Sequence, residues 1–444
     1  MSSLLSRDGP GLSGDTEATL PPSVPQRASG LRICIVTQYF WPENFRINDL
    51  VQALVDRGNV VQVLTGLPNY PGGKVAAGFK TLKPKRSDVF GSTVLRVPLV
   101  PRGKGGGLRL AANYLSFAAS ATFLGVRAMR KPADVVLAYE PSPVTVAIPA
   151  LALGKRLQAP VLMWVQDLWP ETLRATGVLS EGSALRAAGW FTGRLHRAMD
   201  GLLVQTRAFG PLLESQGVAP AKITYLPNWA EDYFRPTIVP TTAPERQEIP
   251  KGFVVLFAGN IGVAQGLDVL LGAAERLREL QDIHWVVLGE GRQAPWLRHE
   301  IERRGLNSVH FLGPRPSESM PTWFALADAL LVTLRPDPIY KLTIPSKIQA
   351  YLACGRPVLA SLDGVGAQEV EDAGAGLASP AGDVEALAAV TRRLYDLPPE
   401  ERAAMGERAR SHYDHNFNRE MLIERIDNLL HSAAAARLNE RAKA

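Results

Sequence analysis

Short apolar runs rich in β-branched residues alternate with stretches of helical periodicity through the first half of the chain. Residues 32–38 (RICIVTQ) form one apolar run, residues 47–58 repeat apolar positions at helical spacing, and residues 60–66 (VVQVLTG) form a second run. This order predicts a βαβ unit. Further runs that we interpret as strands of the same parallel, doubly wound sheet lie at 93–100, 134–140, 160–167 and 201–206.

A second series of the same kind follows a stretch near 236–250 that is rich in Pro, Thr and charged residues, which we interpret as a linker. Its apolar runs lie at 254–259, 283–291, 309–313, 329–334, 357–361 and 374–380, with a helical stretch at 267–280. The terminal segment, from Glu400 to about Ala444, is charged and helical, and we expect it to pack back across both domains.

The chain length supports two domains, because 444 residues that are 46% hydrophobic are too many for one ordinary core and too apolar for disorder. The predicted organisation is a disordered leader at 1–30, a Rossmann-like domain at 31–235, a second Rossmann-like domain at 236–410 and a helical segment at 411–444. Ligands of open α/β sheets bind outside the carboxyl ends of the strands. The active site is therefore expected in a cleft between the two domains.

Composition argues against several classes of protein. Residues 1–30 are rich in Ser, Gly, Pro and Thr and lack an apolar run of signal-peptide length. Cys34 and Cys354 lie far apart inside apolar stretches, so we interpret them as reduced core residues of a cytoplasmic protein. The best candidate for a membrane span, 108–129, contains Arg109 and Arg127, so we expect no integral membrane protein.

The net charge of +6 and the pI of about 9.3 fit phosphate-bearing ligands, nucleic acid or an anionic membrane surface equally well. Basic residues concentrate between Lys74 and Lys131, where Asp88 is the one acid, and the same stretch contains the apolar segment 108–126. A core helix is the favoured interpretation of this segment. The alternative is an interfacial helix, which gains from both apolar burial and attraction to anionic lipid.

Glycines follow the first two strands predicted for the second domain. Gly259, Gly262 and Gly266 stand where the chain turns from strand to helix, so backbone N–H groups there can approach a phosphate. The next turn carries four further candidates for contact with a base or a diphosphate: Gly289, Glu290, Gly291 and Arg292. Close packing of the turns would require glycines equally well.

The segment 335–361 is the most informative for chemistry. Arg335, Lys341 and Lys347 lie close in sequence to a helix start at Pro345 and Ser346, so ammonium, guanidinium, hydroxyl and dipole can converge on a diphosphate. A solvated basic loop is the alternative. We favour the functional interpretation because the loop precedes a helix and a strand that are expected to be buried.

Two polar loops follow predicted strands of the first domain. Asp167 and Glu171 come directly after the run at 160–167, where Asp167 can orient an acceptor hydroxyl, take its proton, or only cap a helix. Glu43, Asn44 and Arg46 follow the first strand and face the second domain, unless they only build a loop and a helical turn. Of the histidines, only His412 and His415 lie close together, on a charged helix, so the sequence supports no metal site and we expect no cofactor.

The chain resembles the retaining glycosyltransferases of family 4, and within them the branch for bacterial capsule, colanic-acid and O-antigen sugars that includes L-fucosaminyl transferases. The motifs that carry the resemblance occur in a fixed order: QYFWPENFRINDL, TGLPNYPGG, VQDLWPET, LPNWAE, AGNIGVAQGLD, GEGRQ and IPSKIQAYLACGRPV. Together they are specific, and the resemblance covers nearly all of the chain after about residue 31. It implies the GT-B fold, in which two Rossmann-like domains face a cleft.

The resemblance also implies metal-independent chemistry, with donor binding by the second domain and acceptor binding by the first. It places Gly262 in the loop facing the donor diphosphate, Ser346 and Lys347 near the diphosphate, and Asp167 at the catalytic position. The sequence departs from the family at four positions. Many members carry an Arg and a Lys where Asn260 and Gln265 stand, and two glutamates where Leu342 and Ala350 stand.

Because lost cations must be replaced where a nucleoside diphosphate departs, we expect Arg335, Lys341 and Lys347 to be the substitutes. The predicted function is retaining transfer of a sugar from a nucleotide sugar, with UDP preferred over GDP from the resemblance alone. The expected acceptor is a saccharide, or a polyprenyl-diphosphate-linked one at the inner leaflet, where the protein would be peripheral; no nucleic-acid partner is expected.

Two other functions remain open from the sequence. A GT-B nucleotide-sugar epimerase would need paired carboxylates and histidines in the cleft, and the sequence offers no evident set. A nonenzymatic protein that binds a nucleotide sugar or a membrane is the other alternative, because the four family positions are altered.

Overall fold

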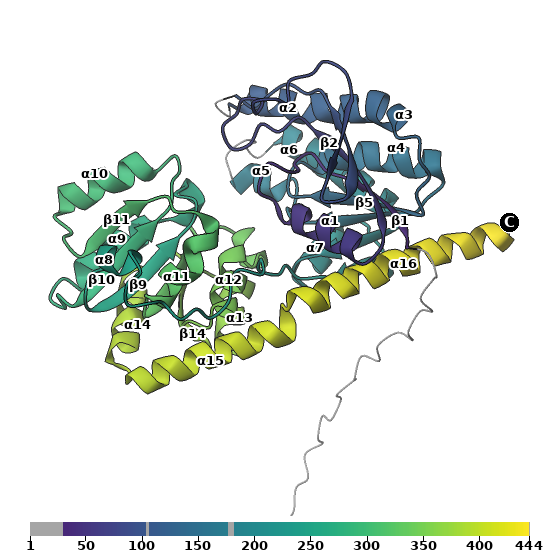
Figure 1. Cartoon of the computed structure of the whole chain (residues 1–444). Helices are drawn as coiled ribbons and strands as arrows, with labels where there is room; N and C mark the ends of the chain where they lie inside the picture. The colour runs from purple at the N-terminus through teal and green to yellow at the C-terminus, as the bar shows by residue number, and fades with distance from the viewer. Residues whose placement is uncertain (1–29, 104–105, 176–181, 444) are drawn as a thin grey trace, which may run out of the picture.

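The computed structural model describes residues 30–103, 106–175 and 182–443, so nearly all of the predicted leader lies outside the described residues. Each apolar series forms one sheet, and the two sheets build two lobes that lie side by side (Figure 1). The strands of the N-terminal lobe are β1 (Arg32–Val36), β2 (Val60–Gly66), β3 (Lys85–Val89), β4 (Ser92–Val97), β5 (Val135–Glu140), β6 (Val161–Val165), β7 (Gly201–Val204) and β8 (Ile223–Tyr225).

The order in this sheet is β3-β4-β2-β1-β5-β6-β7-β8, and every pair is parallel except β3 with β4. The sequence prediction of a parallel sheet holds apart from this antiparallel edge. β3 (KRSDV) has no apolar run to reveal it, because it is an exposed edge strand. Phe90 and Gly91 both have positive φ between β3 and β4, the backbone of a two-residue hairpin turn.

Helices cover both faces of the first sheet. They are α1 (Arg46–Asp56), α2 (Gly107–Ser120), η1 (Ala121–Gly125), α3 (Val126–Ala128), η2 (Val144–Val146), α4 (Ala147–Leu157), α5 (Glu171–Ala175), α6 (Ser183–Ala198), α7 (Phe209–Ser215) and η3 (Pro220–Lys222). One face forms a core with residues of α2, η1, α4, α6 and α7. The opposite face packs against α1 and against the last helix of the chain.

The C-terminal lobe has a six-stranded parallel sheet in the order β11-β10-β9-β12-β13-β14. Its elements are α8 (Glu245–Glu248), β9 (Phe253–Ala258), η4 (Val263–Gln265), α9 (Asp268–Arg276), β10 (Ile283–Leu288), α10 (Ala294–Arg304), β11 (Val309–Gly313), η5 (Ser317–Ser319), α11 (Met320–Ala325), β12 (Ala329–Thr333), η6 (Tyr340–Leu342), α12 (Ser346–Ala353), β13 (Val358–Ser361), α13 (Val365–Asp372), β14 (Gly376–Ser379), α14 (Val384–Asp396) and α15 (Pro399–Asn416). The last helix, α16 (Arg419–Lys443), follows them in the chain.

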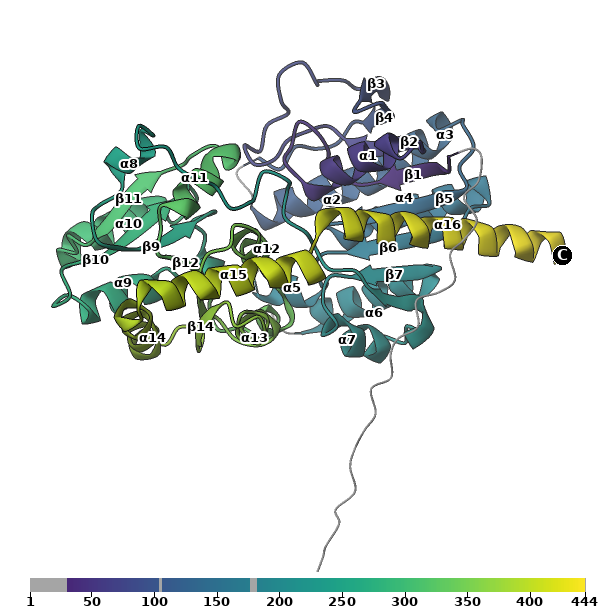
Figure 2. The same cartoon turned by 60° about the horizontal axis from the view of Figure 1, so that its bottom comes forward.

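The chain crosses between the lobes twice. On the first crossing, Trp229 is buried in the N-terminal core and Phe234 packs on the C-terminal core, so the linker starts earlier than the predicted 236–250. On the second crossing, α15 packs on the C-terminal lobe and α16 runs along the N-terminal lobe (Figures 1 and 2). The predicted boundary between residues 410 and 411 therefore falls inside α15, and the expected return of the terminal helix is present.

Candidate functional site

A cleft of about 470 Å³ lies between the two lobes. The N-terminal lobe contributes Asn44, Arg46, Tyr70 and Pro71, and the linker contributes Glu231, Tyr233 and Phe234. The remaining lining residues come from the C-terminal lobe: Ala258, Gly259, Asn260, Leu288, Gly289, Glu290, Pro314, Arg315, Ser317, Met320, Phe324, Ser346, Lys347, Ala350 and Tyr351. Because β9 and β10 end at this cleft, it lies at the carboxyl edge of the second sheet, as predicted.

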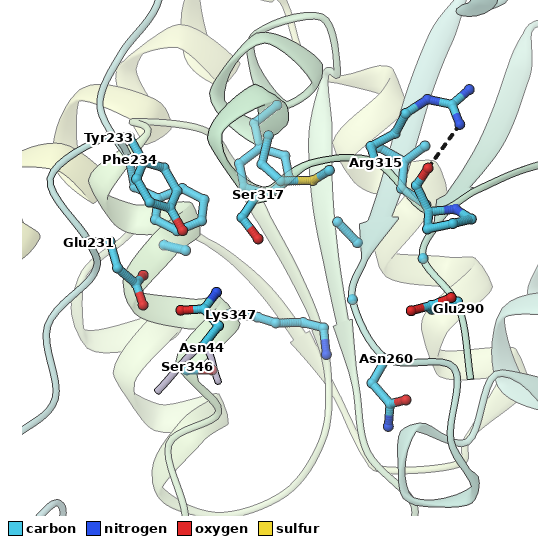
Figure 3. A pocket seen from close by; sticks show the side chains of 18 of the residues that line it. Asn44, Glu231, Tyr233, Phe234, Asn260, Glu290, Arg315, Ser317, Ser346 and Lys347 are labelled. Carbon is cyan, nitrogen blue, oxygen red and sulfur yellow. Dashed lines mark hydrogen bonds between the residues drawn. The ribbon is translucent and has the colours of Figure 1, made fainter. Parts of the chain in front are cut away.

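Like Arg315, Lys347 is a cation that the C-terminal lobe places in the lining of this cleft. It stands in the first turn of α12, half-buried, and its side chain extends across the floor of the cleft towards Asn260 (Figure 3). Its Nζ donates a hydrogen bond to Gln265 Oε1 at 2.7 Å and lies 4.9 Å from the ring centroid of Phe257. Burial without a carboxylate partner lowers the pKa of Lys347 to about 8. An anion that enters the cleft would therefore meet an ammonium group with unused charge.

The glycine turns make room for this lysine and for each other. A Cβ on Gly259 would lie 2.7 Å from Cε of Lys347, and a Cβ on Gly289 would lie 1.9 Å from the carbonyl oxygen of Gly259. Both residues have positive φ. Close packing therefore explains these glycines by itself, as the alternative interpretation of the sequence allows, while both still line the cleft.

The three predicted cations are not brought together. Lys341 is exposed and forms an ion pair with Asp363 at 3.4 Å, outside the cleft lining. Arg335 lines a separate hollow of about 290 Å³ together with Gly262 and Gly266. The convergence expected from sequence proximity fails because the loop turns Arg335 and Lys341 away from the helix start that carries Lys347.

Some of the other residues predicted to bind the donor line the cleft, and others do not. Asn260, Glu290 and Ser346 line the cleft beside Lys347, and Figure 3 shows Glu290 and Glu231 on opposite sides of it. Gly291 and Arg292 are outside the lining, and Gly291 instead packs on the backbone of Ile261.

The loop after β1 supplies two cleft residues and one structural residue. Asn44 and Arg46 line the cleft, and Nε of Arg46 donates to the carbonyl oxygen of Trp229 at 3.0 Å. Glu43 is buried instead, and its carboxylate accepts from the backbone N–H groups of Asn69 and Tyr70, both at 2.7 Å. Glu43 therefore ties two loops together, and the expectation that it binds the acceptor is corrected.

Asp167 and Glu171 lie at the carboxyl edge of the first sheet but outside the lining of the cleft. Asp167 accepts a hydrogen bond from Oγ1 of Thr172, and burial raises its pKa to about 6. Glu171 lines a different groove, between the loop after β6 and helices α6 and α7. The prediction of Glu171 as an acceptor ligand therefore has no support from its position.

A buried carboxyl group beside Asp167 was missed from the sequence. Glu140 ends β5, is 0% exposed, and neither of its carboxylate oxygens has a hydrogen-bond partner. Burial and the negative charge of Asp167 raise its pKa well above the ordinary value. The available signal was an acidic residue at the carboxyl end of an apolar strand.

Further cleft residues were missed from the sequence, among them the polar residues Glu231, Tyr233, Arg315 and Ser317. They come from the linker and from the loop after β11, where no apolar periodicity marks a site. Arg315 is held in place by Glu248, by the carbonyl oxygen of Leu312 at 2.8 Å and by the ring of Trp323.

Among the residues that the structure describes, no group of three or more histidines, cysteines and acids is arranged to hold a metal ion. None of the described helices is both long and apolar enough to cross a membrane.

Comparison with known proteins gives two adjoining family matches. Residues 44–229 match the glycosyl transferase 4-like domain, and residues 252–396 match the glycosyl transferases of group 1. The chain is 25% identical over 322 residues to WcaI of Escherichia coli (strain K12), a glycosyl transferase assigned to colanic acid biosynthesis, with 69% of this chain and 76% of WcaI covered.

Two solved structures share the fold. HepE of Anabaena in complex with UDP and glucose has a TM-score of 0.66 at 17% identity, covering 90% of this chain and 100% of HepE. Sucrose-phosphate synthase of Thermosynechococcus elongatus has a TM-score of 0.69 at 17% identity, covering 91% of this chain and 100% of the synthase.

Proposed function

Because the chain is a glycosyltransferase with the GT-B fold, we propose that it transfers a sugar from a UDP-linked donor to an acceptor of cell-surface polysaccharide biosynthesis. The observation that carries the proposal is the ammonium group of Lys347 in the cleft, at the start of α12, which is held by the amide of Gln265 and forms no ion pair with the described residues. Lys347, Ser346 and the helix N-terminus would together stabilise the departing diphosphate. The UDP preference rests on the family resemblance and fits HepE, which binds UDP.

The proposed reaction retains the anomeric configuration by front-face displacement. The acceptor oxygen forms its bond to the anomeric carbon on the side from which the diphosphate leaves, and the electron pair of the broken bond departs with UDP. Asp167 would take or orient the acceptor proton, because its raised pKa of about 6 is near the range in which a general base works at neutral pH.

A lipid-linked acceptor at the cytoplasmic face of the membrane is the second part of the proposal. Phe117 and Ala121 of the helical segment 107–128 are buried in the core, as the favoured interpretation of the sequence required. The outer side of the same segment exposes Leu108 by 91%, Leu115 by 61% and Phe123 by 64%. Such a surface, with arginines nearby, supports peripheral contact with anionic lipid.

The structure contains one feature that the epimerase alternative needs, a pair of carboxyl groups, but among the described residues it does not place histidines in the cleft. Glu140 and Asp167 are paired carboxyl groups, but Glu140 is fully buried and no histidine of the described residues lines the cleft. The alternative of a nonenzymatic binding protein is distinguished from the transferase by the experiment below.

The experiment incubates the protein with UDP-, GDP- or dTDP-sugars, with and without a detergent-solubilised extract of bacterial membranes. Release of the nucleoside diphosphate only with the extract supports the proposed transferase. Conversion of the nucleotide sugar without the extract indicates the epimerase, and tight binding without turnover indicates a binding protein; both results contradict the proposal.

A further inference from the structure

A loop of the C-terminal lobe is inserted into the core of the N-terminal lobe. Ile339 follows β12 of the C-terminal sheet, yet it is 4% exposed and belongs to the hydrophobic core of the other lobe. Tyr340 and Leu342 pack against the same core, and Tyr340 also packs against the core of its own lobe. Because three neighbouring residues contribute, this segment is a docked element of the N-terminal lobe.

Polar contacts fix the inserted loop on both sides of the chain segment that follows β6 and contains Asp167. Nη2 of Arg174, on α5, lies 3.4 Å from Oδ1 of Asp337. Oγ1 of Thr206, directly after β7, donates to the carbonyl oxygen of Leu342 at 2.7 Å. Oδ1 of Asp337 also accepts from the backbone N–H of Ile339 at 3.0 Å, which shapes the turn.

This anchoring brings Tyr340 near Asp167, between the contacts of the loop with α5 and with the residue that follows β7. Tyr340 is half-buried, and burial raises the pKa of its hydroxyl, with further contributions from the negative charges of Asp337 and Asp167 and an opposing one from Arg335. The same segment continues through Pro345 into Ser346 and Lys347. One short stretch of chain therefore connects the neighbourhood of Asp167 with the ammonium group of the cleft.

We infer that Tyr340 is an acceptor-binding residue contributed by the donor lobe, held near Asp167 by the anchors Asp337 and Ile339. The inference rests on the proposed function and adds the chemistry of the acceptor end. A phenol can donate a hydrogen bond to a sugar hydroxyl and pack its ring on the apolar face of a sugar. A saccharide terminus of the acceptor therefore fits this position.

The test compares Tyr340→Phe, Tyr340→Ala and Ile339→Ala with the wild type in two measurements. UDP affinity is measured by calorimetry, and the acceptor dependence of UDP release is measured by titrating a detergent-solubilised membrane extract against a fixed saturating donor. We expect UDP affinity to stay within about twofold in all three variants. Acceptor kcat/KM should fall about tenfold in Tyr340→Phe and further in Tyr340→Ala, because a hydrogen bond to a neutral group is lost first and the ring contact second.

Ile339→Ala tests the anchor separately. It should lower acceptor kcat/KM without changing UDP affinity, since it loosens the loop and leaves Lys347 in place. Arg392→Ala, which removes a surface ion pair with Glu279 elsewhere in the C-terminal lobe, is the matched control and should change neither quantity. Unchanged acceptor kcat/KM in Tyr340→Ala overturns the inference, and equal loss of UDP and acceptor binding in Ile339→Ala does so as well. Absence of transfer by the wild type with every donor would instead contradict the proposed function.

Discussion

Glu140 is a buried acid without a hydrogen-bond partner, and its protonation should be visible in stability. Because its pKa in the folded state is raised, the folded protein binds more protons than the unfolded chain above the ordinary pKa of a glutamate. Its contribution to stability is therefore greatest at acid pH and is lost as the pH rises towards the folded pKa. Glu140→Gln has no proton to release, so its free energy of unfolding should not fall in this way. The difference between the variant and the wild type should therefore grow, in favour of the variant, by up to about 1.4 kcal/mol for each unit of rising pH.

Denaturant unfolding at several pH values between 5 and 9 checks this prediction. Glu407→Gln, which changes an exposed glutamate on α15, is the control and should run parallel to the wild type. Parallel curves for Glu140→Gln as well would show that the carboxyl group of Glu140 is ionised at the same pH in both states.

Single residues were the least predictable from the sequence, for a physical reason. Glu43 and Asn44 are neighbours in one loop, yet Glu43 is buried on backbone N–H groups and Asn44 faces the cleft. Arg335, Lys341 and Lys347 are close in sequence, yet only Lys347 enters the cleft. Direction within a loop depends on tertiary contacts, which sequence spacing does not contain.

The helical segment formed by α2, η1 and α3 has apolar residues on both sides. One side completes the core, and the other exposes large apolar residues. If the exposed side meets lipid, Leu115→Glu and Phe123→Glu should each weaken binding to vesicles that contain anionic phosphatidylglycerol. We expect a loss of about tenfold, since partial burial of one large apolar side chain contributes about 1.5 kcal/mol.

Cosedimentation with such vesicles measures the effect, and UDP-induced thermal stabilisation reports that the fold persists. Ile238→Glu is the matched control, because Ile238 is 97% exposed in the linker and away from this segment. Equal vesicle binding by all variants would remove this surface from the proposal.

Elements were predicted well where burial imposes a pattern and poorly where it does not. The predicted apolar runs of both sheets appear as strands, because parallel strands buried on both faces are continuously apolar. β3 and β8 were missed, since β3 is polar and exposed and β8 is a short edge strand.

At the scale of the whole molecule, α16 fastens the chain end to the N-terminal lobe. Leu422, Ile426 and Leu430 are buried in its core, and Arg419 forms a bidentate contact with Asp49 at 2.7 and 2.9 Å. Arg419→Ala should lower the free energy of unfolding by about 1–3 kcal/mol, because the hydrogen bonds to a half-buried carboxylate are lost. Arg437→Ala, on the same helix but in an exposed pair with Glu440, should cost no more than about 0.5 kcal/mol.

Denaturant unfolding of the two variants decides this prediction. Equal destabilisation by both, or none by either, would mean that the Arg419 contact does not fasten α16 to the N-terminal lobe. The return of the terminal helix was predictable from its length and charge, whereas its point of crossing was not, because the break between α15 and α16 carries no strong sequence signal.

The most direct test of the central claim is a calorimetric titration of UDP into the wild type, Lys347→Met and the control Lys251→Met. Lys251 precedes β9 at the end of the strand away from the cleft, so its loss should leave UDP affinity unchanged. Loss of a charge-assisted hydrogen bond to the diphosphate should weaken UDP binding to Lys347→Met by about tenfold to a hundredfold. Wild-type affinity should also fall as the pH rises above about 8, where the ammonium group of Lys347 loses its proton. Equal UDP affinity in Lys347→Met and the wild type would contradict the account.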